Sequence, residues 1–160
     1  DVPGIVPEVL QDLPVHWLID EAAEVRVDTP SGARTLRLMG VRTTYRLARD
    51  RAAMQRLVDE VPRDGARVLL YHTPDLMPDA SQRDVDLYLC GHTHGGQIRL
   101  PLYGAVATSS RWGKRYEQGR YQENGTTLYV SRGLGLEGLG APRARFLAPP
   151  EIILWELASA

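Results

Sequence analysis

Two short apolar runs, each followed by a histidine, constrain the fold of this 160-residue chain more than any other feature. Val68–Tyr71 directly precedes His72, and Val85–Cys90 precedes His92 with one glycine between them. Both runs are rich in residues that favour strands. Residues 73–84 separate them, which is enough chain for a crossover between parallel strands. Because parallel neighbours end at one edge of a sheet, the pattern predicts an α/β fold in which the two histidines lie together.

The rest of the chain predicts elements that complete such a fold. Residues 23–27 and 34–41 have the composition of strands, with the turn Ser31-Gly32 between them. Residues 50–61 have helical apolar spacing, and Asp50 is the expected N-cap. The other expected elements are a short helix at 6–13, a loop at 101–115, hairpin strands at 118–123 and 126–131 around Asn124-Gly125, and a last strand from Glu151 to Leu157.

Size and composition favour one globular domain over residues 1–160. Apolar residues make up 43% of the chain, which is sufficient for a normal core. Cys90 is the only cysteine, so a disulfide framework is excluded, and its apolar surroundings predict a buried thiol. No apolar run approaches the ~20 residues of a membrane span. The chain starts with Asp1 rather than Met, so we expect this start to be a boundary that an upstream segment once preceded.

The second histidine opens a glycine-rich segment, Gly91-His92-Thr93-His94-Gly95-Gly96-Gln97. Imidazoles are good ligands for zinc, iron and manganese. The glycines allow the backbone to turn tightly and to approach an ion or a phosphate. Thr93 and Gln97 could orient the imidazoles by hydrogen bonds. The segment therefore predicts a metal site built from His72, His92 and His94, whereas the plainer interpretation is a pair of surface histidines in a glycine loop.

A basic stretch follows these histidines directly. Residues 98–145 contain seven arginines, one lysine and three acidic residues, a balance of +5. This charge favours an anionic ligand near the histidines, and the alternative is a solvated basic loop. We expect Arg111, Arg115 and Arg132 to border the substrate site.

Residues 69–75 and 86–97 together resemble the calcineurin-like metallophosphoesterases. The resemblance continues through residues 100–104, 129–133 and 149–152. This extended pattern is similar to a bacterial subgroup that includes lipid-precursor pyrophosphohydrolase-like and cell-envelope-associated phosphoesterases.

The resemblance implies a metallophosphoesterase-type α/β sandwich with mixed sheets, ending in a β-hairpin and a final strand. It also implies that His72 and His92 bind one divalent ion and His94 a second, with manganese, iron or zinc as candidates. Thr93, Gly95, Gly96 and Gln97 would then support the ligands or the substrate. The implied activity is hydrolysis of phosphate esters or pyrophosphates of small molecules or lipid precursors. The implied location is the cytoplasm, membrane or envelope of a bacterium.

The family pattern also contains Asp-x-His, Gly-Asp and Gly-Asn-His segments, and this sequence has none of them. Its only asparagine, Asn124, is assigned to a turn. The family's acid histidine and asparagine are therefore absent, and no catalytic residue beyond the metal ligands is expected. We expect the chain to be the C-terminal portion of such a domain, to need the missing N-terminal portion as its partner, and to be nearly inactive alone.

Three other interpretations remain open. Gly133–Gly138 has the Gly-x-Gly-x-x-Gly spacing of a dinucleotide site, but the prolines that follow argue against the helix such a site needs. Residues 111–116 mix basic and aromatic side chains, as a nucleic-acid surface does, but the patch is short and the overall pI is near 6.5, so a nucleic-acid partner is not expected. The chain could also be a non-catalytic module that binds a metal ion or phosphate.

Overall fold

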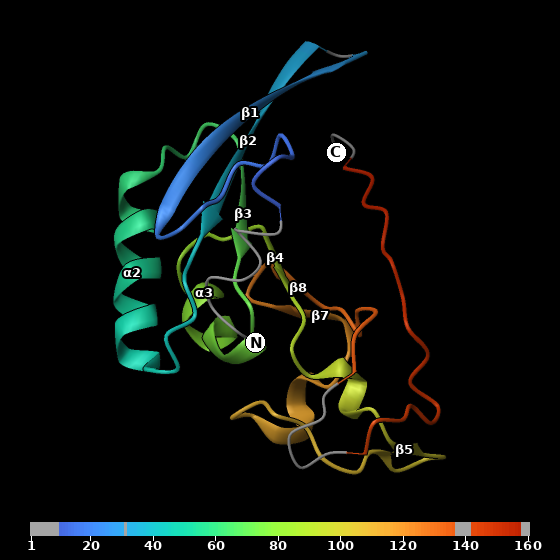
Figure 1. The fold of residues 1–160 in the computed structure, drawn as a ribbon. Helices are drawn as coiled ribbons and strands as arrows, with labels where there is room; N and C mark the ends of the chain where they lie inside the picture. The colour runs from blue at the N-terminus through green and yellow to red at the C-terminus, as the bar shows by residue number, and fades with distance from the viewer. Residues whose placement is uncertain (1–9, 31, 137–141, 158–160) are drawn as a thin grey trace.

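A computed structural model describes residues 10–30, 32–136 and 142–157, and a six-stranded mixed sheet organises them (Figure 1). The strand order across the sheet is β1-β2-β3-β4-β8-β7. The strands are β1 (Glu21–Thr29), β2 (Gly32–Gly40), β3 (Ala66–Leu70), β4 (Leu87–Cys90), β7 (Gly119–Glu123) and β8 (Thr126–Val130). This arrangement confirms the predicted α/β class.

The centre of the sheet is parallel and both margins are antiparallel. Strands β2, β3, β4 and β8 are parallel neighbours, with Leu69 opposite Tyr88 across β3 and β4. Strand β1 pairs with β2, and β7 pairs with β8, in antiparallel register. The carboxyl ends of β3 and β4 therefore meet at one edge, as the sequence predicted.

Helix α2 (Leu47–Glu60) covers one face of the sheet and carries the predicted apolar stripe. The predicted N-cap is wrong, because the helix begins earlier and Arg46 is its N-cap. Asp50 lies inside the first turn with only 1% of its surface exposed. Its carboxylate accepts hydrogen bonds from the Thr44 amide at 3.0 Å and the Tyr71 hydroxyl at 2.7 Å. Asp50 thus joins the helix to the end of β3.

The crossover between β3 and β4 adds two short helices to the same core. They are the 3₁₀ helix η1 (Pro74–Leu76) and α3 (Met77–Ala80). Leu76, Met77 and Ala80 are fully buried there beside the core residues of α2. Cys90 is partly buried against this core, and burial raises the pKa of its thiol. None of the described helices is long and apolar enough to cross a membrane.

The predicted final strand at Glu151–Leu157 is wrong. Residues 151–157 join no sheet in the structure, and Ile152 and Leu154 are strongly exposed. The segment lies over the sheet face instead, where Trp155 packs edge-on against Tyr129 with ring centroids 5.3 Å apart. Because it crosses a face rather than an edge strand, its backbone groups meet no ladder of hydrogen-bond partners.

The chain after β4 contains more structure than the predicted loop at 101–115. It forms a small hairpin of β5 (Arg99–Leu100) and β6 (Gly104–Ala105), followed by the 3₁₀ helix η3 (Gly113–Tyr116). The predicted hairpin of β7 and β8 is confirmed, with positive φ at both Asn124 and Gly125.

Three predictions fall partly outside the described residues. Residues 6–9 of the predicted first helix and Ser31 of the predicted turn lie outside them. Residues 10–12 form a turn rather than helix. The Gly-x-Gly-x-x-Gly segment is described only to residue 136, and no helix occurs in that described part.

Candidate metal and phosphate site

Two histidines converge where β3 and β4 end. The His72 Nε2 and His92 Nδ1 atoms are 3.0 Å apart, and the two ring centroids are 4.7 Å apart. His72 lies two residues beyond the end of β3 at Leu70, and His92 lies two residues beyond the end of β4 at Cys90. The predicted proximity of these side chains is confirmed. The two nitrogens are within hydrogen-bonding distance of each other, and two ligands of one ion would also lie this close together.

The backbone that carries His92 and His94 is strained. His92, His94 and Gln97 have φ values of 71°, 49° and 53°, in the left-handed region that non-glycine residues disfavour. Each such residue costs of order 1–3 kcal/mol, and strain of this kind clusters at functional sites. Surrounding contacts must therefore hold the segment in place.

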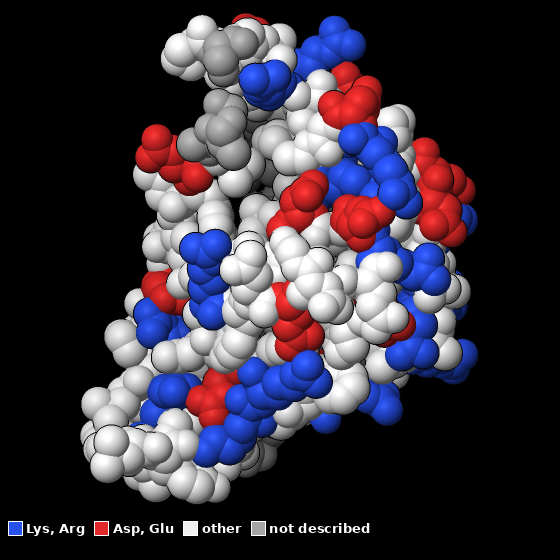
Figure 2. All heavy atoms as spheres, turned by 180° about the vertical axis from the view of Figure 1, so that it is seen from behind, with Lys and Arg blue, Asp and Glu red and all other residues white. Residues whose placement is uncertain are grey.

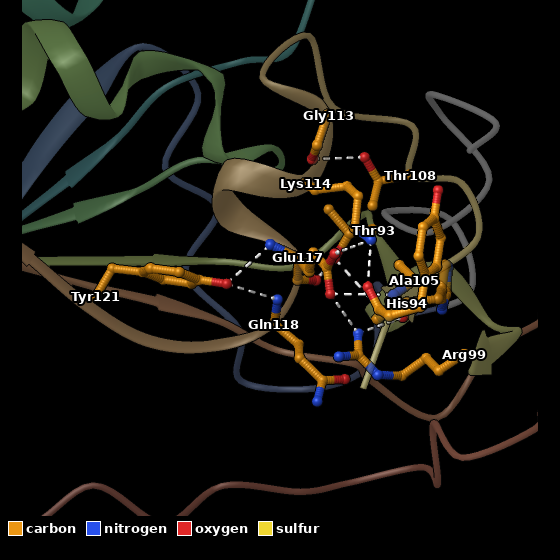
Figure 3. Close-up of polar contacts among 12 residues, drawn as sticks. Thr93, His94, Arg99, Ala105, Thr108, Gly113, Lys114, Glu117, Gln118 and Tyr121 are labelled. Carbon is orange, nitrogen blue, oxygen red and sulfur yellow. Dashed lines mark hydrogen bonds and ion pairs between the residues drawn. The ribbon is translucent and has the colours of Figure 1, made fainter. Parts of the chain in front are cut away.

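Glu117 supplies several of those contacts (Figure 3). Its backbone carbonyl accepts a hydrogen bond from the Thr93 hydroxyl at 2.7 Å. Its carboxylate accepts from the Ala105 amide at 3.2 Å and pairs with the Arg99 guanidinium at 2.8 Å. Thr93 also accepts from the Gly95 amide at 3.4 Å. The Thr93 hydroxyl therefore holds the backbone between the two histidines in place, and its role in orienting an imidazole stays a prediction.

Two further contacts fix the same loop. The Gln97 side-chain amide donates to the Pro142 carbonyl at 3.2 Å. Gly96, at φ 80°, lies so close to the β5–β6 hairpin that a Cβ there would be 2.6 Å from the Ala107 carbonyl oxygen and would overlap the Ala105 methyl. The close approach explains why this position requires glycine.

Arg145 contacts the third histidine. Its Nη2 atom lies 3.1 Å from His94 Nδ1 and also donates to the carbonyls of Arg132 at 2.7 Å and Gly135 at 2.6 Å. Burial lowers the pKa of this guanidinium, and the nearby Arg132 lowers it further. The 51 residues that separate Arg145 from His94 leave no local sequence signal for this contact.

The described residues fit a divalent ion only in part. His72 and His92 offer two converging nitrogens. A stable transition-metal site usually has at least three protein ligands. Within residues 10–30, 32–136 and 142–157, no group of three or more His, Cys, Asp or Glu side chains could hold a metal ion. Assignment of His72, His92 and His94 as ligands of two ions stays a prediction.

A cavity of about 180 Å³ adjoins this pair, and His92 and Arg111 both line it. Tyr45, Tyr71 and Asp75 contribute polar groups to its wall. Burial and the hydrogen bond to Asp50 raise the pKa of Tyr71, so the phenol stays protonated. The cavity wall therefore carries one guanidinium, several hydroxyl groups and the carboxylates of Asp50 and Asp75 beside His92.

Asp75, which sequence reasoning missed, positions the loop that carries Arg111. Its carboxylate accepts from the Ser110 hydroxyl at 2.8 Å and the Arg111 amide at 3.1 Å. Its backbone carbonyl accepts from the Trp112 indole at 3.1 Å. Because Asp75 lies three residues after His72, one segment positions both a histidine and the basic loop.

The other two predicted arginines are already paired. Arg115 pairs with Glu123 at 2.8 Å, and its guanidinium lies 5.2 Å from the centroid of the Tyr116 ring. Arg132 pairs with Glu151 through a largely buried bridge. These pairs offset the charges that the sequence assigned to substrate binding, and that role stays a prediction for both residues.

Comparison with known proteins identifies sequences that this chain is similar to. No family model and no solved structure matches the chain. Several curated bacterial proteins do match. The chain is 48% identical over 92 residues to the uncharacterised metallophosphoesterase YkuE of Bacillus subtilis, a match that covers 58% of this chain and 31% of that protein.

Two further relatives have more specific names. The chain is 39% identical over 92 residues to the phosphodiesterase YaeI of Escherichia coli, covering 57% of this chain and 32% of YaeI. It is 36% identical over 94 residues to the UDP-2,3-diacylglucosamine pyrophosphatase LpxG of Chlamydia trachomatis, covering 54% of this chain and 27% of LpxG. The matches span about a third or less of each relative's length. The chain is a homologue of the bacterial metallophosphoesterases and corresponds to the C-terminal part of the proteins that it matches.

Proposed function

We propose that this chain is the C-terminal part of a metal-dependent hydrolase of phosphate esters or pyrophosphates. One observation carries the proposal, the convergence of His72 Nε2 and His92 Nδ1 at 3.0 Å where two parallel strands end. The cavity that adjoins His92 is lined by Arg111, so the place for a phosphate lies beside the place for a metal ion.

In this proposal His72 and His92 hold one divalent ion and His94 contributes to a second. Manganese, iron and zinc all accept imidazole ligands. When bound, such ions polarise the phosphate and lower the pKa of a water. The hydrogen bond from the Thr93 hydroxyl to the Glu117 carbonyl helps to hold the strained backbone that carries His92 before any ion binds. Because a guanidinium only donates, the contact with His94 Nδ1 places the proton of the neutral imidazole on Nε2, so Arg145 has to give up this contact before His94 binds an ion.

Arg111 binds the phosphate in this proposal. A guanidinium forms paired hydrogen bonds to phosphate oxygens and stays charged at every physiological pH. Its backbone amide is held by Asp75, so its loop is fixed before the substrate arrives. The substrate is a phosphorylated small molecule or a lipid precursor, an assignment supported by the name of the LpxG relative.

The test uses the parent protein that contains this chain. His92→Ala should remove most turnover of a chromogenic phosphate diester and lower the bound metal content. His16→Ala is the matched control, because His16 is exposed and lies before β1, and it should retain full turnover. Near-wild-type turnover with full metal content in His92→Ala would contradict the proposal.

A second candidate function is a non-catalytic module that binds metal or phosphate. The lack of a three-ligand group in the described part of the chain favours it. Metal binding by the parent without turnover of any phosphate ester would support this function over hydrolysis. Nucleic-acid binding is less favoured, because the Trp112 indole donates to Asp75 and Tyr116 is buried, so these rings are not free to stack on bases.

A further inference from the structure

The β5–β6 hairpin ends in apolar side chains that the fold does not bury. Leu100, Tyr103 and Val106 are about half exposed, at 47%, 58% and 52%. Leu102, at the turn, is completely exposed. Its φ is 63°, a region in which glycine or asparagine is favoured over leucine. Neither burial nor backbone preference therefore accounts for leucine at the tip of this hairpin.

Basic side chains surround this apolar tip. The Lys114 Nζ atom lies 3.4 Å from the centroid of the Tyr103 ring and donates to the Tyr103 carbonyl. Residues 98–116 contain four basic residues and no acidic one, and the glutamates that compensate part of this charge, Glu117 and Glu123, lie just beyond the segment. Figure 2 shows an uncharged protrusion at the lower left, bordered by basic side chains with an acidic group among them. An exposed aliphatic tip with an aromatic ring and a lysine behind it suits the boundary between lipid chains and headgroups.

We propose that the β5–β6 tip, defined by Leu100, Leu102, Tyr103 and Val106, docks this protein onto an anionic lipid surface. The apolar side chains enter the interface, and the net positive charge of the segment behind them attracts the anionic surface. A second copy of the chain is a poorer occupant, because two basic tips would repel each other. The tip is also too small and convex for a stable protein interface, which buries roughly 800 Å² on each partner.

The tip is coupled to the histidine loop through Glu117. The Glu117 carboxylate binds Arg99 of β5 and the Ala105 amide of β6, while its carbonyl binds the Thr93 hydroxyl between the two histidines. Docking of the tip therefore sets the orientation of the histidine loop toward the lipid surface. Headgroup phosphates would then lie at the same end of the molecule as His94.

The test measures co-sedimentation of the 160-residue chain with vesicles, in EDTA so that no metal ion contributes. Vesicles of phosphatidylcholine mixed with phosphatidylglycerol are compared with phosphatidylcholine alone. Leu102→Asn replaces the most exposed apolar side chain of the tip. Asparagine suits the left-handed backbone at this position, so the fold is kept. It should weaken binding to anionic vesicles by about tenfold. Lys114→Gln should weaken it by about fivefold.

Leu154→Asn is the matched control, since Leu154 is 95% exposed but lies in the C-terminal segment. It should bind anionic vesicles like the wild type. Equal binding by Leu102→Asn and the wild type, or an equal loss in Leu154→Asn, would overturn the proposal. A concentration-dependent dimer that Leu102→Asn abolishes would also overturn it, by showing that a second copy covers the tip. Because EDTA is present, these outcomes are separate from those of the phosphoesterase test.

Discussion

Glu117 connects the β5–β6 hairpin to the histidine loop, and its removal should destabilise the whole chain. Glu117→Ala breaks the ion pair with Arg99. Both side chains of this pair are largely buried, with 17% of Arg99 and 11% of Glu117 exposed. Loss of one partner from a buried pair costs about 3–5 kcal/mol. Arg99 also donates to the Gly95 carbonyl at 3.0 Å, and this remaining bond places the expected loss at the lower end, about 3 kcal/mol.

The assay is urea unfolding of the 160-residue chain, followed by tryptophan fluorescence, with the free energy of unfolding extrapolated to water. Glu60→Ala is the control, because Glu60 forms an exposed pair with Arg56 one helical turn away. Exposed pairs of this kind contribute about 0.3–0.5 kcal/mol. A loss for Glu117→Ala no larger than that for Glu60→Ala would refute the claim that Glu117 holds the loop.

Two other predictions concern the same site. Gly96→Ala should cost more than about 2 kcal/mol, measured by the same unfolding assay, because its methyl would overlap Ala105 in addition to the left-handed strain. Gly119→Ala shares a φ near 80° but has no atom within 4 Å of the new methyl, so a similar loss in both would show that strain alone acts at Gly96. Arg111→Ala should weaken binding of inorganic phosphate to the chain by about tenfold, measured calorimetrically, as expected for loss of a charged hydrogen bond. Arg115→Ala should leave phosphate binding unchanged, because Glu123 already neutralises Arg115, and equal losses would mean that the basic stretch acts only through its total charge.

The proximity of His72 and His92 could be predicted from the sequence because it depends on local patterns. Apolar runs of four to six residues before His72 and His92 predict strands, and a spacing too long for a hairpin predicts a parallel pair. The neighbouring ends of β3 and β4 then require the histidines to be close. The hairpin around Asn124-Gly125 was predictable for the same reason, since both residues tolerate positive φ.

The contacts that hold the site were not accessible in this way. Thr93 and Glu117 are 24 residues apart, Asp75 and Arg111 are 36 apart, and each pair forms through loops whose paths no periodicity encodes. The predicted final strand failed for a related reason. Residues 151–157 have the composition of a strand, but a strand also needs a partner edge, and composition does not show that the segment crosses the sheet face.

The net charge of residues 98–145 does not show which of their basic side chains can bind a ligand. A balance of +5 over residues 98–145 favours an anionic ligand near the histidines, but it treats all cations alike. In the structure Arg99, Arg115 and Arg132 pair with glutamates, and Arg145 donates to backbone carbonyls beside His94. Among the three arginines that the sequence selected, Arg111 lines the cavity next to His92. Because a paired cation must give up its partner before it binds a ligand, Arg111 can bind phosphate at the lowest energetic cost of the three.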